Sequence, residues 1–103
     1  MDIKQARTAL TKRILEGPGV AERVKRGAAF HNSGLDGAVG TLVDKVARHA
    51  FQVSDEDITH AKDSGLSEDE VFEIVVCAAV GQATRQYDTA LAALESAAGK
   101  ESA

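Results

Sequence analysis

The chain is short of the residues that cross-link, kink or stiffen a protein. Its 103 residues include one Cys, one Pro, no Trp and only 4% aromatic side chains. A single Cys excludes an internal disulfide framework, a two-cysteine redox centre and a zinc site built from several thiolates. No stretch approaches the ~18 consecutive apolar residues of a membrane span, and no apolar run follows the early basic residues as in a signal peptide. We therefore expect one soluble, cytoplasmic domain that does not enter a membrane.

Alanine is abundant instead. It occurs 18 times, whereas the β-branched and aromatic residues favoured in strands are scattered. Because alanine is the strongest helix former and one Pro leaves long segments unbroken, the sequence predicts an all-α domain of about five helices over residues 1–103. Small side chains let helices approach closely but leave a core thin in bulky groups. We therefore expect a homo-oligomer.

The spacing of apolar residues predicts three helices in the first half of the chain. The first covers residues 2–16, and the second begins at Pro18, a residue suited to the first helical position, and ends near residue 30. Three glycines predict a loop over residues 32–40. A third helix follows over residues 42–51.

Two further helices are predicted from their capping signals. One begins after Ser54 and stops at Gly65, and the other runs over residues 67–98; each starts with a Ser cap and a flanking pair of apolar residues. Residues 71–80 are apolar almost all round, which is typical of a buried central helix. We expect Gly81 to bend this helix and the tail 99–103 to be frayed.

The acidic triplets and the histidines do not predict a metal site. Residues 55–57 and 68–70 lie in first helical turns, where carboxylates stabilise unpaired N–H groups. His31, His49 and His60 include no pair four residues apart and no His-Glu-x-x-His motif. We interpret the triplets as helix caps and expect neither a metal nor a cofactor.

The thiol and the charge pattern have plain structural interpretations. Cys77 lies in an apolar segment, where a thiol is a core residue with a raised pKa rather than a nucleophile. Residues 1–26 carry seven basic and three acidic residues, whereas residues 27–103 carry five and thirteen. A basic pair of helices facing an acidic remainder explains this asymmetry as well as nucleic-acid binding does. The acidic total and the lack of aromatic partners for bases disfavour nucleic acid.

The second half of the chain carries an ordered set of signals. Ala61 and Gly65 lie four residues apart, the cap at 67–70 follows, and an Ala-rich segment covers 77–98. In this order they resemble the alkyl hydroperoxidase D-like (AhpD-like), or carboxymuconolactone decarboxylase-like, superfamily over residues 50–98. Redox members carry Cys-x-x-Cys, then a His, an Ala and a Gly at fixed spacing, and then such a helix start. The resemblance implies an AhpD-like helical bundle whose protomers assemble as trimers or hexamers.

The departures from that pattern bear on function. Aligned on Gly65, the two cysteine positions hold Ala50 and Val53, and the histidine position holds Asp57. The disulfide relay of the redox members needs both thiols and the neighbouring base, so it cannot run here. Our first hypothesis is therefore a non-redox, small oligomeric binding or accessory protein without peroxidase activity.

An alternative hypothesis follows from the decarboxylase branch of the same superfamily. The chain would then be a cysteine-independent lyase or isomerase acting on a small anionic molecule. His49, Asp57 and His31 would supply acid–base catalysis, and Arg48 and Arg85 would bind a substrate carboxylate. A third hypothesis, nucleic-acid binding through the first two helices, is the weakest.

Overall fold

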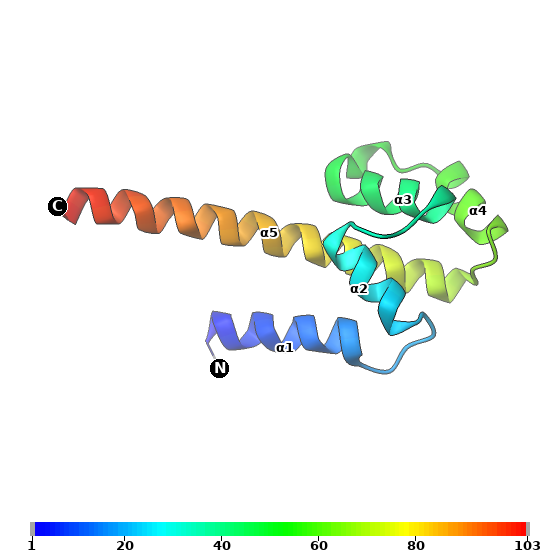
Figure 1. Ribbon diagram of the computed structural model, residues 1–103, viewed down its shortest axis with the longest axis horizontal. Coiled ribbons are helices and arrows are strands. Elements are labelled where there is room, and N and C mark those ends of the chain that lie inside the picture. Colours follow the sequence, from blue (N-terminus) through cyan, green and yellow to red (C-terminus); the bar gives the residue numbers. More distant parts are fainter. Residues whose placement is uncertain (1, 103) are drawn as a thin grey trace.

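The computed structural model describes residues 2–102, with the side chains of residues 2–99. Within this range the chain is all-helical, with five α-helices, one short 3₁₀ turn and no strand, as the alanine content predicts (Figure 1). The elements are α1 (Ile3–Glu16), α2 (Arg23–His31), α3 (Gly37–Arg48), η1 (Ala50–Gln52), α4 (Asp55–Asp63) and α5 (Glu68–Ser102).

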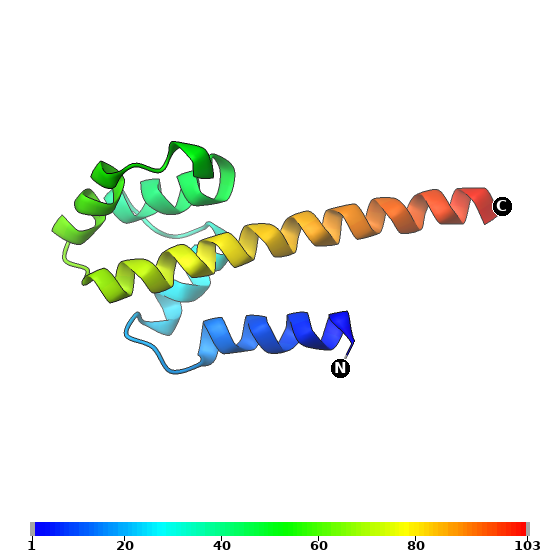
Figure 2. The same ribbon diagram turned by 180° about the vertical axis from the view of Figure 1, so that it is seen from behind.

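Helix α5 is the axis on which the other helices pack. α2 crosses it, α3 and α4 lie to one side of it, and α1 runs alongside it on the other (Figures 1 and 2). The other helices cover α5 as far as Asp88, which pairs with Arg7 of α1, and the remainder of α5 extends past them (Figures 1 and 2). The molecule is therefore long and narrow, measuring 56 × 29 × 20 Å. The tail that we expect to be frayed is helical as far as Ser102, and Ala103 lies outside the described residues.

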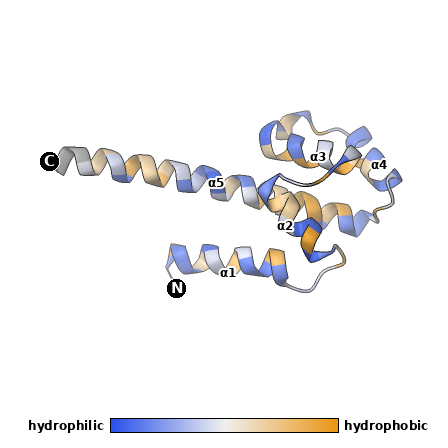
Figure 3. Cartoon of the chain, viewed as in Figure 1, coloured by the Kyte–Doolittle hydropathy of each residue, from blue (hydrophilic) through white to orange (hydrophobic). Residues whose placement is uncertain are grey.

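The core forms where α2 and α3 meet the first half of α5. Figure 3 shows the most hydrophobic residues concentrated around this crossing. Five of the eleven buried hydrophobic residues in the described part are alanine, so the helices approach closely. The buried residues of the first cluster are Ala21, Ala29, Phe30, Val43, Ile74, Cys77 and Ala78. Those of the second are Leu42, Ala61 and Val71.

The capping signals are confirmed in the structure. Ser54 Oγ accepts a hydrogen bond from the Asp57 N–H at 3.3 Å, and the Asp57 carboxylate accepts one from the Ser54 N–H at 3.0 Å. Ser67 and Glu70 make the same reciprocal pair, with both distances 3.1 Å. Gly65 has a φ of +113°, which favours glycine. The acidic triplets therefore supply helix caps.

Helix α2 begins later than the spacing predicts. The sequence predicts a start at Pro18, but the helix begins at Arg23. The N–H groups of Val20 and Ala21 instead donate to the Glu73 carboxylate of α5, at 2.9 and 2.6 Å. This tertiary contact holds the preceding segment outside the helix.

Helix α3 begins earlier than predicted. It starts at Gly37, inside the expected loop, and ends at Arg48, and the turn η1 follows in place of a last helical turn. Gly40 is helical and lies against the backbone of Leu35, whose carbonyl oxygen would overlap a Cβ at this position. Gly40 therefore allows the helix to lie close to the Leu35 backbone, and it does not belong to a flexible loop.

Gly81 has a packing role that the sequence does not indicate. Helix α5 is uninterrupted at this residue. A Cβ at Gly81 would overlap the carbonyl oxygen of Phe30, at the end of α2. The same oxygen accepts a hydrogen bond from Arg85 Nη1 at 2.6 Å. The crossing of α2 over α5 therefore depends on the missing side chain at Gly81.

Candidate functional site

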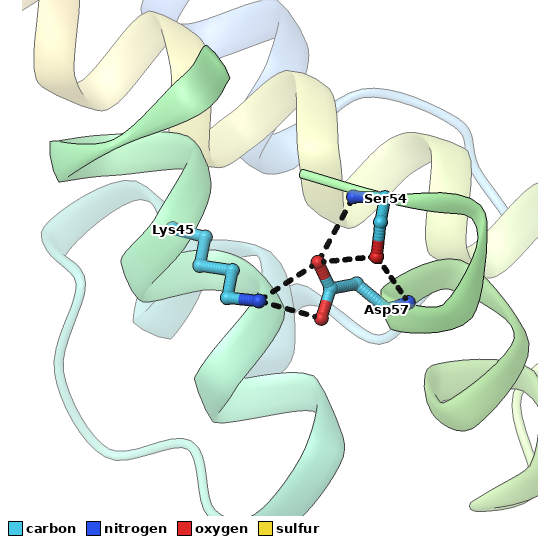
Figure 4. A network of polar contacts seen from close by, with 3 residues as sticks. All are labelled: Lys45, Ser54 and Asp57. Atoms are coloured by element: carbon cyan, nitrogen blue, oxygen red, sulfur yellow. Dashed lines mark hydrogen bonds and ion pairs between the residues drawn. The ribbon is translucent and has the colours of Figure 1, made fainter. Parts of the chain in front are cut away.

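Asp57, a predicted acid–base residue, lies in the first turn of α4 and faces α3 (Figure 4). Lys45 Nζ donates to both carboxylate oxygens, at 2.9 and 3.0 Å. The Ser54 N–H and hydroxyl donate to Oδ2 at 3.0 and 3.1 Å. The hydrogen bond from Lys45, assisted by the Ser54 backbone, holds the pKa of Asp57 below its usual value. Such a carboxylate is a weak base, and its position ties α4 to α3.

The two predicted catalytic histidines lie on the surface at helix ends. His49 follows α3, with its ring edge-to-face against Phe51 at 6.2 Å between centroids. His31 ends α2 and packs edge-to-face against Phe30 at 5.0 Å. Within the described residues, no hydrogen bond or ring contact joins either histidine to Asp57.

The two predicted carboxylate-binding arginines contact different elements. Arg48 Nε pairs with Asp44 at 3.1 Å within α3, and both side chains are largely exposed. Arg85 donates to the Phe30 carbonyl and to Gln82 Oε1, so it closes the C-terminal end of α2. Each residue of the lyase hypothesis therefore has its own local partner in the described part of the chain.

Cys77 is a core residue, as its apolar surroundings predict. It is 1% exposed, and its thiol donates to the Ile14 carbonyl oxygen at 3.6 Å. Burial raises the pKa of the thiol. The positions that hold cysteines in the redox members of the resembled superfamily are Ala50, which opens η1, and Val53, which packs against the second core cluster.

The basic residues near the N-terminus are partly engaged within the chain. Arg7 of α1 pairs with Asp88 of α5, and its guanidinium lies 4.2 Å from the Tyr87 ring centroid. Arg26 of α2 is buried. The Arg7–Asp88 pair fits the interpretation in which a basic segment faces acidic parts of the protein, whereas Arg26 makes no ion pair among the described residues.

A pocket that the sequence does not predict lies between the end of α1, the turn that follows it, α2 and α5. Its volume is about 300 Å³. The lining is mixed, with apolar side chains, two arginines and one carboxylate. It consists of Arg13, Ile14, Pro18, Arg26, Phe72, Glu73, Val76 and Cys77.

Arg26 is the one buried charged residue among the described side chains, at 5% exposed. Its Nη1 donates to the carbonyl oxygens of Gly17 and Ile14, at 2.8 and 3.3 Å, while its Nε is buried without a hydrogen-bond partner. One sequence signal marks this residue. Arg26, Ala29 and Phe30 are spaced as the buried face of a helix, so an arginine occupies a core position.

Three further observations bear on the function of the chain. The described helices include none long and apolar enough to cross a membrane. Within the described residues, His, Cys, Asp and Glu side chains form no group of three or more that could hold a metal ion. Comparisons with protein-family models, curated proteins and solved structures found no match.

Proposed function

We propose that the chain is a small oligomeric binding or accessory protein, a non-redox relative of the AhpD-like superfamily, without peroxidase activity. The observation that carries this proposal is the burial of the chain's one thiol. Cys77 is 1% exposed, and its pKa is raised by that burial. Thiol peroxidases need an accessible thiolate, and positions 50 and 53 hold Ala50 and Val53 instead.

Exposed apolar side chains support the assembly of several copies. Helix α1 has no buried residue, and it exposes Ile3 and Leu10. The second half of α5 exposes Leu91 and Leu94. Large apolar side chains along two neighbouring helices are typical of surfaces that pack against another chain.

The distribution of charge favours a second copy of this chain as the partner that covers the exposed apolar side chains of α1 and α5. Residues 1–26 are net basic and the remainder is net acidic, so α1 of one protomer is attracted to the acidic remainder of another. The resemblance implies that such protomers form a trimer or a hexamer.

Native mass spectrometry of the purified protein tests the assembly. We expect one discrete species of three or six subunits. A monomer over the concentration range in which the protein is prepared would contradict the proposal.

A peroxidase assay tests the missing activity. We expect that the protein with hydrogen peroxide and dithiothreitol consumes peroxide no faster than its Cys77→Ser variant. This variant is a close match in size, so it controls for folding. Turnover that the substitution abolishes would assign a redox role to Cys77.

A further inference from the structure

We propose that the pocket between α1, α2 and α5 binds a small carboxylate with an apolar body, held by Arg13 and Arg26. This inference rests on the binding role proposed above, and it names the site and the ligand class.

Arg26 places a positive charge in the interior of the protein. Its guanidinium is cationic, and the side chain is 5% exposed. Its Nη1 hydrogen bonds end on neutral carbonyl oxygens, and it makes no ion pair in the described part of the chain. A buried guanidinium without an ion pair is unfavourable, and Glu73, the one carboxylate of the same lining, makes no ion pair with it in the described part of the chain. A ligand carboxylate in the pocket would supply that ion pair.

Glu73 shares the pocket but is already engaged. Both of its carboxylate oxygens accept from the Val20 N–H, at 2.9 Å, and one also accepts from the Ala21 N–H, at 2.6 Å. Arg13 brings a second cation to the lining. The backbone N–H groups are neutral, so Glu73 keeps its negative charge, and the two arginines and one glutamate of the lining carry a formal net charge of +1. The pocket therefore favours an anion over a cation.

The rest of the lining indicates the body of the ligand. Ile14, Pro18, Phe72 and Val76 provide apolar walls. A volume of about 300 Å³ is at the small end of ligand pockets, which are mostly apolar with a few placed polar groups. Guanidinium groups match carboxylates in a paired, planar geometry. A single-ring or short aliphatic carboxylate fits this combination better than inorganic phosphate, which has no apolar part.

Benzoate is the probe, and benzyl alcohol is its neutral counterpart of similar shape. We expect benzoate to shift the backbone resonances of Phe72, Val76 and Cys77, which line the pocket, saturably in two-dimensional ¹H–¹⁵N TROSY spectra. Benzyl alcohol should bind at least about tenfold more weakly, because it cannot form charge-assisted hydrogen bonds. Equal binding of the two probes, or benzoate shifts that do not saturate or that lie outside the pocket, would overturn the proposal.

Two variants locate the charge effect. Arg13→Gln removes an exposed pocket arginine and should weaken benzoate binding about tenfold. Lys62→Gln removes the same charge from the exposed surface of α4 and should leave binding unchanged. Equal losses in the two variants would show general charge attraction and would sink the proposed site.

The Arg26→Lys variant keeps the positive charge and tests whether the guanidinium group of the buried Arg26 contributes to benzoate binding. The ammonium group lacks the planar fork of guanidinium, so we expect weaker benzoate binding in a protein whose spectrum remains dispersed. Unchanged binding would remove Arg26 from the site. The subunit count and the peroxidase assay use no carboxylate ligand, so failure of benzoate to bind leaves the assembly and the missing peroxidase activity standing.

Discussion

Asp57 illustrates how a single residue links local and tertiary structure. Its carboxylate accepts the Ser54 N–H at the N-terminus of α4, and the same carboxylate pairs with Lys45 of α3. The Lys45 hydrogen bond lowers the pKa of Asp57 in the folded state, below the unfolded value of about 3.9. Its contribution to the free energy of unfolding is therefore present above the unfolded pKa, and it is lost as pH falls through the lower folded pKa.

We predict that Lys45→Met raises the pKa of Asp57, because the largest cause of its depression is removed. The variant should also lose less stability than the parent protein as pH falls below about 4. Carboxyl ¹³C NMR titration measures the pKa, and urea unfolding across pH measures the stability. Lys62→Gln serves as the control, with no change expected in the Asp57 pKa. The same Asp57 pKa in the parent and in Lys45→Met would refute this assignment.

Gly81 and Gly27 both lie within helices, but Gly81 is tightly packed against another helix and Gly27 is not. A Cβ at Gly81 would overlap the Phe30 carbonyl oxygen, whereas a Cβ at Gly27 meets nothing within 4 Å. We predict that Gly81→Ala lowers the free energy of unfolding by about 1–3 kcal/mol, through overpacking. Gly27→Ala should raise it by about 0.4–1 kcal/mol, because alanine favours the helix. Urea denaturation measures the stability of both variants. Effects of the same sign would contradict the packing role assigned to Gly81 at the crossing of α2 and α5.

At the scale of elements, Glu73 of α5 sets where α2 begins. Its carboxylate accepts the N–H groups of Val20 and Ala21, and Ala21 is 2% exposed. We predict that Glu73→Ala costs about 1–3 kcal/mol of stability, because a buried N–H loses its acceptor. Glu73→Gln keeps one acceptor oxygen and should lose less. Chemical denaturation compares the two variants, and the reverse order would show that the carboxylate has no such role.

The sequence predicts elements whose boundaries are set locally. Ser54 and Ser67 carry their capping partners three residues away, so both helix starts are visible in the sequence. The start of α2 is not, because Glu73 lies more than fifty residues from the N–H groups that it accepts. The role of Gly81 is hidden for the same reason, since its neighbour is the backbone of α2.

Less of the candidate site than of the fold could be predicted from the sequence. The spacing of Arg26, Ala29 and Phe30 would have marked Arg26 as facing the core, but the pocket itself brings together the end of α1, the following turn, α2 and α5. The residues assigned under the lyase hypothesis, among them His49 and Arg48, instead have separate local partners. Spacing within one helix places side chains on a face, but it does not show which other helix meets that face.

At the scale of the whole molecule, the long α5 makes the chain extended. Its Cα radius of gyration is 16.0 Å, whereas a compact chain of this length has about 13 Å. Leu91 and Leu94 lie on the part of α5 beyond Asp88, at 37% and 66% exposed. These exposed apolar side chains support the proposed assembly of several copies.

We predict that the double variant Leu91→Gln, Leu94→Gln has fewer subunits than the parent protein and keeps its helical circular dichroism. The apolar contacts between copies are lost, while the core at the α2–α5 crossing is untouched. Light scattering after size-exclusion chromatography measures the mass. Val24→Gln, at an 81% exposed position away from this part of α5, should leave the mass unchanged. A double variant with the parent's mass would exclude this part of α5 as the interface.

The seclusion of Cys77 also makes the chain a convenient subject for spectroscopic labelling. Because the chain's one native thiol is enclosed in the core, maleimide and methanethiosulfonate labels have no competing target on the surface of the folded protein. A cysteine introduced at exposed Thr59 of α4 would therefore accept one spin label per protomer. In the proposed assembly, dipolar distances between those labels would give the arrangement of the copies without a crystal.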